Sequence, residues 1–160
     1  MATDLTYIES MFKANTDIVN KAVADVGTGD WFRKPGDDSN HLMWVMGHLI
    51  VHRGVTLKVL GGQWDSSWAP LFARGAERVG DDEYPSSEEM KSAWQQVSAD
   101  LVAAVRNAPA DLLNTDTAAG ALSFDGKVSG SVALLAFHDT YHAGQVSYLR
   151  KWLGYGQTVG

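Results

Sequence analysis

The stretch Phe137-His138-Asp139-Thr140-Tyr141-His142-Ala143-Gly144-Gln145 contains two histidines four residues apart. Residues four apart on an α-helix lie one above the other on the same face, so both imidazoles can reach one point. The pair belongs to a repeat in steps of three and four, which consists of Ser131, Leu135, His138, His142, Gln145, Leu149 and Trp152. This repeat predicts a helix whose histidine-bearing face packs against other helices. Buried imidazoles need polar partners, and a shared metal ion with a third ligand is one such partner.

Composition narrows the class of protein. We predict a single domain over residues 1–160, because this length is enough for one sizeable core. The net charge of −6 and the lack of a basic run argue against a nucleic-acid partner. The chain has no cysteine, which excludes disulfides and a thiolate of the protein itself as ligand or nucleophile. We expect a cytoplasmic protein with no membrane partner, because we find no secretory signal and no apolar run of membrane-spanning length.

Apolar periodicity predicts an all-α protein with four long helices. The first covers about residues 4–26, and the second covers about residues 40–60 with Ser39 as a plausible N-cap. The third starts at Ser86 or Ser87 and stops near Asn107, and the fourth runs from Ser129 or Ser131 to Gly154. The segment between the second and third helices is long, irregular and rich in aromatic residues. We therefore predict a four-helix bundle with one long crossover between its second and third helices.

Several polar residues fall on faces that are otherwise apolar. His41, His48 and His52 follow one stripe of the second predicted helix, with His52 displaced by about 40° and roughly 6 Å from His48. We interpret His41 as structural and His52 as a residue that lines a pocket or orients a ligand. Asn15 in the first helix faces the site or, more ordinarily, fixes helix register. Gln145 either orients a histidine through a hydrogen bond or packs between helices.

A zinc protease is an alternative for the histidine pair, because its helix reads His-Glu-x-x-His with the glutamate as general base. Asp139 occupies the glutamate position with a shorter side chain, and we interpret it as a solvated or helix-pairing acid. Common zinc proteases take their third ligand from downstream, but no Asp, Glu or His follows His142. A third ligand must come from upstream, and His48 beside Gly47 is the best candidate.

Four motifs, in order, resemble the DinB/YfiT-like superfamily. They are Asn40-His41-Leu42-Met43-Trp44-Val45-Met46-Gly47-His48-Leu49, Trp68-Ala69-Pro70-Leu71-Phe72-Ala73-Arg74-Gly75, Tyr84-Pro85-Ser86 and His138-x-x-x-His142-x-Gly144-Gln145. The resemblance covers nearly the whole chain. It implies a four-helix bundle with one divalent metal ion, usually nickel or zinc, held by three histidines. Transferred residue by residue, the implied metal ligands are His48, His138 and His142.

The resemblance also implies functions and partners. Characterised branches include thiol-S-transferases that use bacillithiol or related thiols, and a mycothiol-dependent maleylpyruvate isomerase; many members form homodimers. We therefore expect a small-molecule substrate, a low-molecular-weight thiol and a homodimer. Three imidazoles leave coordination positions open, as in catalytic sites, so our main hypothesis is a metal-dependent thiol-S-transferase acting on a small electrophile. A metal-dependent hydrolase and a non-catalytic metal-binding or stress-related protein are the alternatives.

Residues outside the histidine set complete the predicted site. Arg53 on the second helix or Arg74 in the crossover could bind a carboxylate of the thiol, although a solvated surface arginine is the more ordinary role of each. The aromatic residues Trp64, Trp68 and Phe72 of the crossover would wall the pocket, although packing alone also explains them. The sequence identifies no catalytic acid or base.

Overall fold

The computed structural model describes residues 4–159, and this range contains five α-helices and no β-strand. Four helices are long: α1 (Thr6–Val23), α2 (Leu42–Val59), α3 (Ser87–Arg106) and α5 (Val128–Trp152). The all-α prediction is confirmed. The fifth helix, α4 (Ala110–Leu113), was not predicted, because four residues are too few to show a helical repeat. Within the described range, no helix combines the length and the apolar character needed to cross a membrane.

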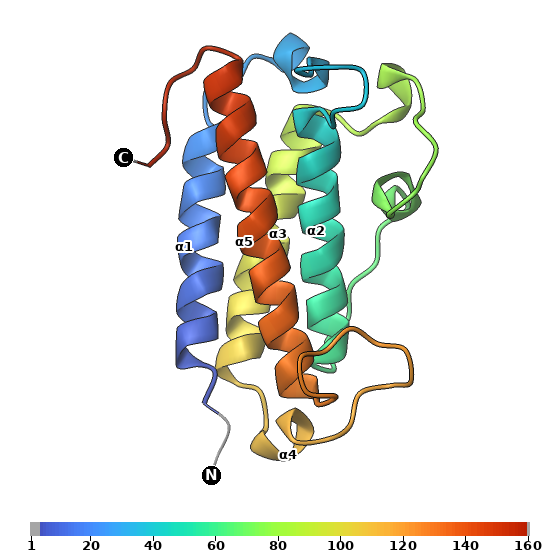
Figure 1. Ribbon diagram of the computed structural model, residues 1–160, viewed down its shortest axis with the longest axis vertical. Helices are drawn as coiled ribbons and strands as arrows, with labels where there is room; N and C mark the ends of the chain where they lie inside the picture. Colours follow the sequence, from blue (N-terminus) through green and yellow to red (C-terminus); the bar gives the residue numbers. More distant parts are fainter. Residues whose placement is uncertain (1–3, 160) are drawn as a thin grey trace.

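The four long helices lie side by side along the long axis of the molecule (Figure 1). α1 and α2 each pack against both α3 and α5. α1 and α5 run in one direction, and α2 and α3 run in the other (Figure 1). Each long helix contributes to one shared core, with Phe12, Leu49, Trp94 and Val146 among its buried side chains.

α2 begins slightly later than the sequence suggested, because His41 and not Ser39 caps it. The Nδ1 atom of His41 accepts a hydrogen bond from the backbone N–H of Trp44, at 3.1 Å. The cap satisfies one of the backbone donors that every helix leaves unpaired at its first turn. The imidazole of His41 also packs against Phe32 and Tyr84, with ring centroids 5.4 Å away in both cases. His41 therefore has the structural role that we expected of it.

The segment between α2 and α3 runs along the outside of α2 (Figure 1). Two glycines of α2 make this close approach possible. A Cβ atom at Gly47 would lie 2.3 Å from the ring of Phe72, and one at Gly54 would lie 2.1 Å from the ring of Trp64. Both distances are far below van der Waals contact, so only glycine leaves room for these two rings. The aromatic residues of the segment thus hold it against the histidine-bearing helix.

An ion pair between Arg53 of α2 and Asp139 of α5 lies inside the helical core. Arg53 Nε donates to Asp139 Oδ1 and Arg53 Nη2 donates to Oδ2, both at 2.9 Å. Only 1% of Arg53 and 2% of Asp139 is exposed to solvent. The prediction of a solvated or ligand-binding Arg53 is therefore wrong. Asp139 is a helix-pairing acid, as one of its two interpretations stated, and it is not solvated.

α1 and α3 also form hydrogen bonds with this ion pair. Asn15 of α1 donates from Nδ2 to Asp139 Oδ2 at 2.9 Å, and also to Thr140 Oγ1. Arg53 Nη1 donates to Ser98 Oγ of α3 at 2.6 Å and to Thr16 Oγ1 of α1 at 2.7 Å. The Asn15 amide belongs to the packing of the helices, which agrees with the register interpretation. One polar cluster therefore connects all four long helices.

Replacing Asp139 by alanine should lower the free energy of unfolding by about 3–5 kcal/mol, because the buried guanidinium of Arg53 would lose its counter-charge. Chemical denaturation followed by circular dichroism measures this change. Asp116→Ala is the matched control, because Asp116 pairs with Lys127 on the surface and such pairs contribute little. Equal stability of the two variants would contradict a structural role for the buried pair.

Candidate metal centre

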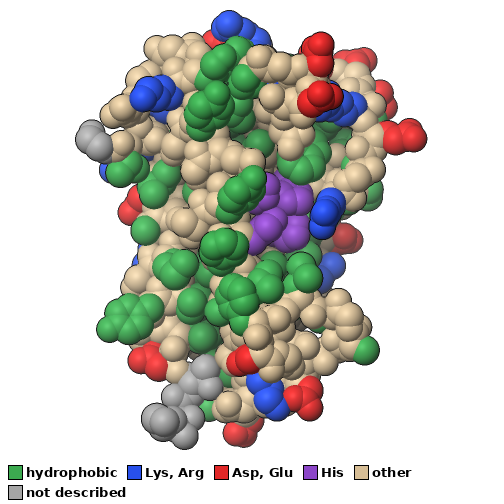
Figure 2. Space-filling view, viewed as in Figure 1, with side chains coloured by type: hydrophobic (Ala, Val, Ile, Leu, Met, Phe, Trp, Pro, Cys, Tyr) green, Lys and Arg blue, Asp and Glu red, His purple; other side chains and the backbone are tan. Residues whose placement is uncertain are grey.

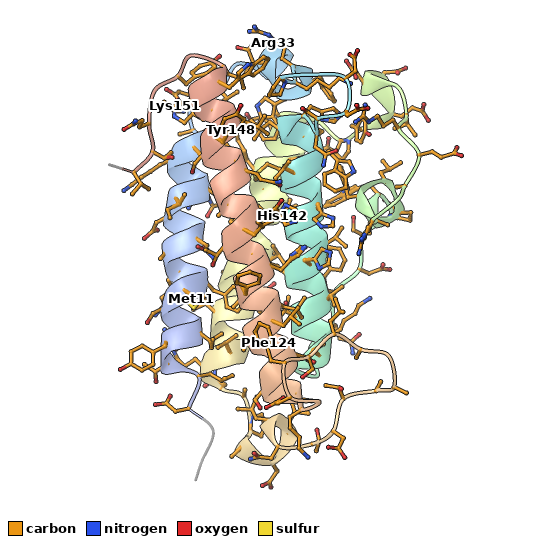
Figure 3. All side chains as sticks on the ribbon, viewed as in Figure 1. Met11, Arg33, Phe124, His142, Tyr148 and Lys151 are labelled. Atoms are coloured by element: carbon orange, nitrogen blue, oxygen red, sulfur yellow. The ribbon has the colours of Figure 1, made fainter. Side chains whose placement is uncertain are left out.

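Three histidines from two helices meet at one point between α2 and α5. The Nε2 atom of His138 lies 3.3 Å from Nε2 of His48 and 3.1 Å from Nε2 of His142. All three ligand atoms lie within 4.8 Å of one another. Figure 3 shows the labelled His142 about halfway along α5, on the side toward α2. The structure thus brings together the three histidines that the resemblance implied.

Hydrogen bonds at Nδ1 orient two of these histidines. His48 Nδ1 lies 2.8 Å from the backbone carbonyl oxygen of Phe72, and His142 Nδ1 lies 2.6 Å from Gln145 Oε1. A carbonyl oxygen only accepts, so each Nδ1 carries the proton and each Nε2 presents a lone pair. Gln145 Nε2 donates to the Tyr141 hydroxyl at 3.2 Å, so both ends of the amide have a partner. Gln145 therefore orients His142, one of the two roles considered for it.

The arrangement of the three Nε2 atoms calls for a cation. His138 Nε2 faces two unprotonated nitrogens and can donate a proton to only one of them, so the other contact would join two lone pairs. Nitrogens bound to zinc at 2.0–2.1 Å in a tetrahedral site are about 3.3 Å apart. The two distances in the cluster, 3.1 and 3.3 Å, are close to this value. The residues present therefore fit a divalent metal ion.

The cluster is open on one side. Among the described residues, it consists of the three histidines and includes no fourth metal-binding side chain. Figure 2 shows histidine side chains at the molecular surface, with hydrophobic side chains beside them. Tyr141 contacts His142 edge to face, with ring centroids 5.0 Å apart, and 60% of Tyr141 is exposed. An ion at this position would keep coordination sites that a small molecule can reach.

His52 lies beside the cluster and outside it. Its ring centroid is 4.3 Å from that of His48 and 4.1 Å from that of His138. The Nδ1 atoms of His52 and His138 are buried and have no hydrogen-bond partner in the described part of the chain. His52 thus lies next to two of the three histidines, and the pocket-lining role expected of it stays a prediction.

Burial and mutual repulsion keep these imidazoles neutral. Burial is the main cause that lowers the pKa of His52 to about 3, and the charges of His138, His48 and His142 lower it further. Burial also lowers the pKa of His138 to about 4, followed by the charge of His142. The pKa values of His48 and His142 are lowered too, again mainly by burial. Neutral imidazoles are the form that binds a metal.

Two contributors to the site escaped the sequence analysis. The carbonyl of Phe72 orients His48, but a backbone oxygen in an irregular segment leaves no trace in the sequence. Trp44 stacks on His48 with ring centroids 4.6 Å apart and an angle of 14° between the rings. The spacing of four residues from Trp44 to His48 on one helix was a usable signal.

The family of the chain follows from comparison with known proteins. The family model of the DinB superfamily matches residues 11–146, which is most of the chain and includes all three histidines. The chain belongs to the DinB superfamily. This match confirms the resemblance stated from the sequence motifs. No match was found among curated proteins. Membership in the DinB superfamily and the histidine cluster together support a metal site, and neither identifies the metal.

The stability of the metal-free DinB protein should fall as the pH falls from about 6.5 toward 4. The folded-state pKa values of His52 and His138, about 3 and about 4, lie below the unfolded value of about 6.5, so the unfolded chain binds protons first. Their stabilising contribution is therefore complete above pH 6.5 and is lost progressively as the pH falls toward these folded-state values. Thermal melts of chelator-treated protein between pH 7 and pH 5 measure the loss. His52→Gln should reduce the slope; an unchanged slope in that variant would contradict the assignment.

Proposed function

We propose that this DinB protein binds one divalent ion through His48, His138 and His142 and uses it to transfer a thiol to a small electrophile. The observation that carries the proposal is that three Nε2 atoms converge on one point, where the described range supplies no fourth protein ligand for a metal. Imidazole ligands suit both nickel and zinc, which are the two metals that we favour.

The proposed reaction class rests on the ability of a bound metal to activate a thiol and on the absence of cysteine from the chain. A bound divalent ion supplies a Lewis acid that lowers the pKa of a thiol or a water molecule bound to it. The chain contains no cysteine, so a thiol must come from a cosubstrate. Its sulfur would form a bond to the electrophilic carbon while the bond to the leaving group breaks, and the thiol proton would pass to solvent. A reducing cytoplasm is the compartment that fits a free thiol cosubstrate.

The hydrolase alternative is less well supported by the residues around the cluster. In a His-Glu-x-x-His metalloprotease, the carboxylate after the first histidine is the general base. Here both carboxylate oxygens of Asp139 accept hydrogen bonds from Arg53, and the side chain is buried in the helical core. Asp139 is therefore unsuited to activating a water molecule. A non-catalytic binding protein remains the second candidate, because the same three histidines would also hold a structural or sensed metal.

The face of α5 beside the cluster carries several exposed aromatic side chains. Phe137 is 62% exposed, and Tyr141 and Tyr148 are each 60% exposed. Exposed aromatic residues in such number favour contact with a partner or with an apolar substrate. The homodimer that we expected from the resemblance would cover part of this face, and we keep it as part of the proposal.

The purified protein should contain about one divalent ion per chain, and His142→Ala should lose most of it, because two imidazoles bind a metal weakly. Elemental analysis of dialysed protein measures the content. His41→Asn is the matched control: asparagine is also a good N-cap, and His41 lies outside the cluster, so the variant should keep its metal. Unchanged metal content in His142→Ala would refute the metal centre.

Cobalt-substituted protein should develop a thiolate-to-metal charge-transfer absorption band when titrated with bacillithiol, mycothiol or glutathione. The reason is that a thiol bound at an open coordination site loses its proton. The same thiol should then be conjugated to a chloro-aromatic acceptor, which mass spectrometry detects. If no thiol produces the band and no conjugate forms, the transferase should be abandoned in favour of a binding role or hydrolysis.

A further inference from the structure

A cavity of about 300 Å³ opens at the N-terminal end of α2. α2 and the residues before it contribute Asn40, His41 and Trp44 to its wall. The segment between α2 and α3 contributes Arg74 and Arg78. The cavity is distinct from the histidine cluster, since none of the three clustered histidines lines it.

The lining of this cavity is cationic, in a protein whose net charge is −6. It includes two arginines and no acidic side chain. Arg78 donates to the backbone carbonyl oxygens of Asp37, at 2.7 Å, and Ser39, at 3.2 Å, which hold the guanidinium in place without neutralising it. Arg74 is exposed and has no ion-pair partner among residues 4–159. Asp81 is close enough to act on the charge of His41, but neither arginine forms an ion pair with it, and two such guanidinium groups at one cavity favour an anion.

Trp44 and the segment that contains Phe72 connect the wall of the cavity to the histidine cluster. Trp44, which lines the cavity, stacks on the ring of His48. Phe72, whose carbonyl oxygen accepts the proton of His48 Nδ1, precedes Arg74 by two residues. The close packing of Phe72 on Gly47 sets the position of this short segment. A molecule held in the cavity would therefore lie against the aromatic ring that covers one of the three clustered histidines.

We propose that this cavity is an oxyanion-binding subsite, which holds a carboxylate or phosphate group of the small molecule that reacts at the histidine cluster. Arg74 is the principal binding group, because its N–H donors are free to form paired hydrogen bonds with two oxygens of the anion. Arg78 adds positive charge, and the ring of Trp44 contacts the less polar part of the molecule. The assignment to a reacting molecule rests on the proposed function, whereas binding of the anion does not.

The test is an anion titration of full-length, ¹⁵N-labelled protein, followed by the indole N–H signal of Trp44. The signal is assigned with Trp44→Phe. Succinate and inorganic phosphate are the probes, and uncharged succinamide is the ligand control. At least one anion should shift the signal with saturation, and the tighter one decides between a carboxylate and a phosphate. Succinamide should have no effect.

Arg74→Gln should weaken the binding of that anion by about tenfold or more, because a charge-assisted pair is lost. Arg74→Lys should fall between it and wild type, since a lysine keeps the charge without the forked geometry. Arg106→Gln removes the same charge from the surface pair with Glu9, and should change the affinity by less than about twofold. Equal affinity of wild type and Arg74→Gln, or binding of neither anion, would overturn the proposal.

The same samples separate this proposal from the metal centre. Arg74→Gln should retain its metal on elemental analysis, because Arg74 lies outside the three-histidine cluster. Anion binding that disappears in His142→Ala and persists in Arg74→Gln would show that the metal holds the anion, and would also overturn the subsite. Unchanged metal content in His142→Ala would refute the metal centre. Anion binding that depends on Arg74 would still be supported in that case.

Discussion

The ion pair between Arg53 and Asp139 is the constraint on which the rest of the structure depends. A guanidinium and a carboxylate this deeply buried are costly unless nearly all of their hydrogen-bonding capacity is used. The ion pair between α2 and α5 meets that condition because the other two long helices supply hydrogen-bond partners: Asn15 and Thr16 from α1, and Ser98 from α3. An apolar core tolerates small rotations of its helices. The hydrogen-bonded groups around Arg53 and Asp139 tolerate fewer, because each rotation would leave a buried polar group unpaired.

The same ion pair sets the geometry of the histidines. Arg53 directly follows His52 in α2, and Asp139 directly follows His138 in α5. Two parallel hydrogen bonds of 2.9 Å fix the distance and the rotation of α2 relative to α5 at this level. His48 lies about one turn before His52 in α2, and His142 lies about one turn after His138 in α5, so both lie on the same side of the ion pair, where the separation of the helices is already determined. The Nε2 atoms therefore meet because a polar contact in the core, with no metal in it, holds the two helices at the right spacing.

The long helices and the three clustered histidines could be predicted from the sequence. The predictions that were wrong or missing have physical causes. The three-four periodicity gave the long helices, since burial of one face produces that pattern directly. The histidine spacing together with the family motifs gave His48, His138 and His142, which the structure brings together. Arg53 was misjudged because arginine is seldom buried, and only its distant partner Asp139 makes burial possible. The role of the Phe72 carbonyl depends on how an irregular segment folds back, which no local pattern encodes.

Packing at Gly47 controls which nitrogen of His48 carries the proton. The absence of a side chain at this position lets Phe72 sit against the backbone of α2 and aims its carbonyl oxygen at His48 Nδ1. A methyl group there would push the ring away and, with it, the acceptor that keeps the proton on Nδ1. The imidazole would then be free to carry that proton on Nε2, and its lone pair would point away from the other two histidines. A steric change one residue away from His48 would thus act as a change of tautomer.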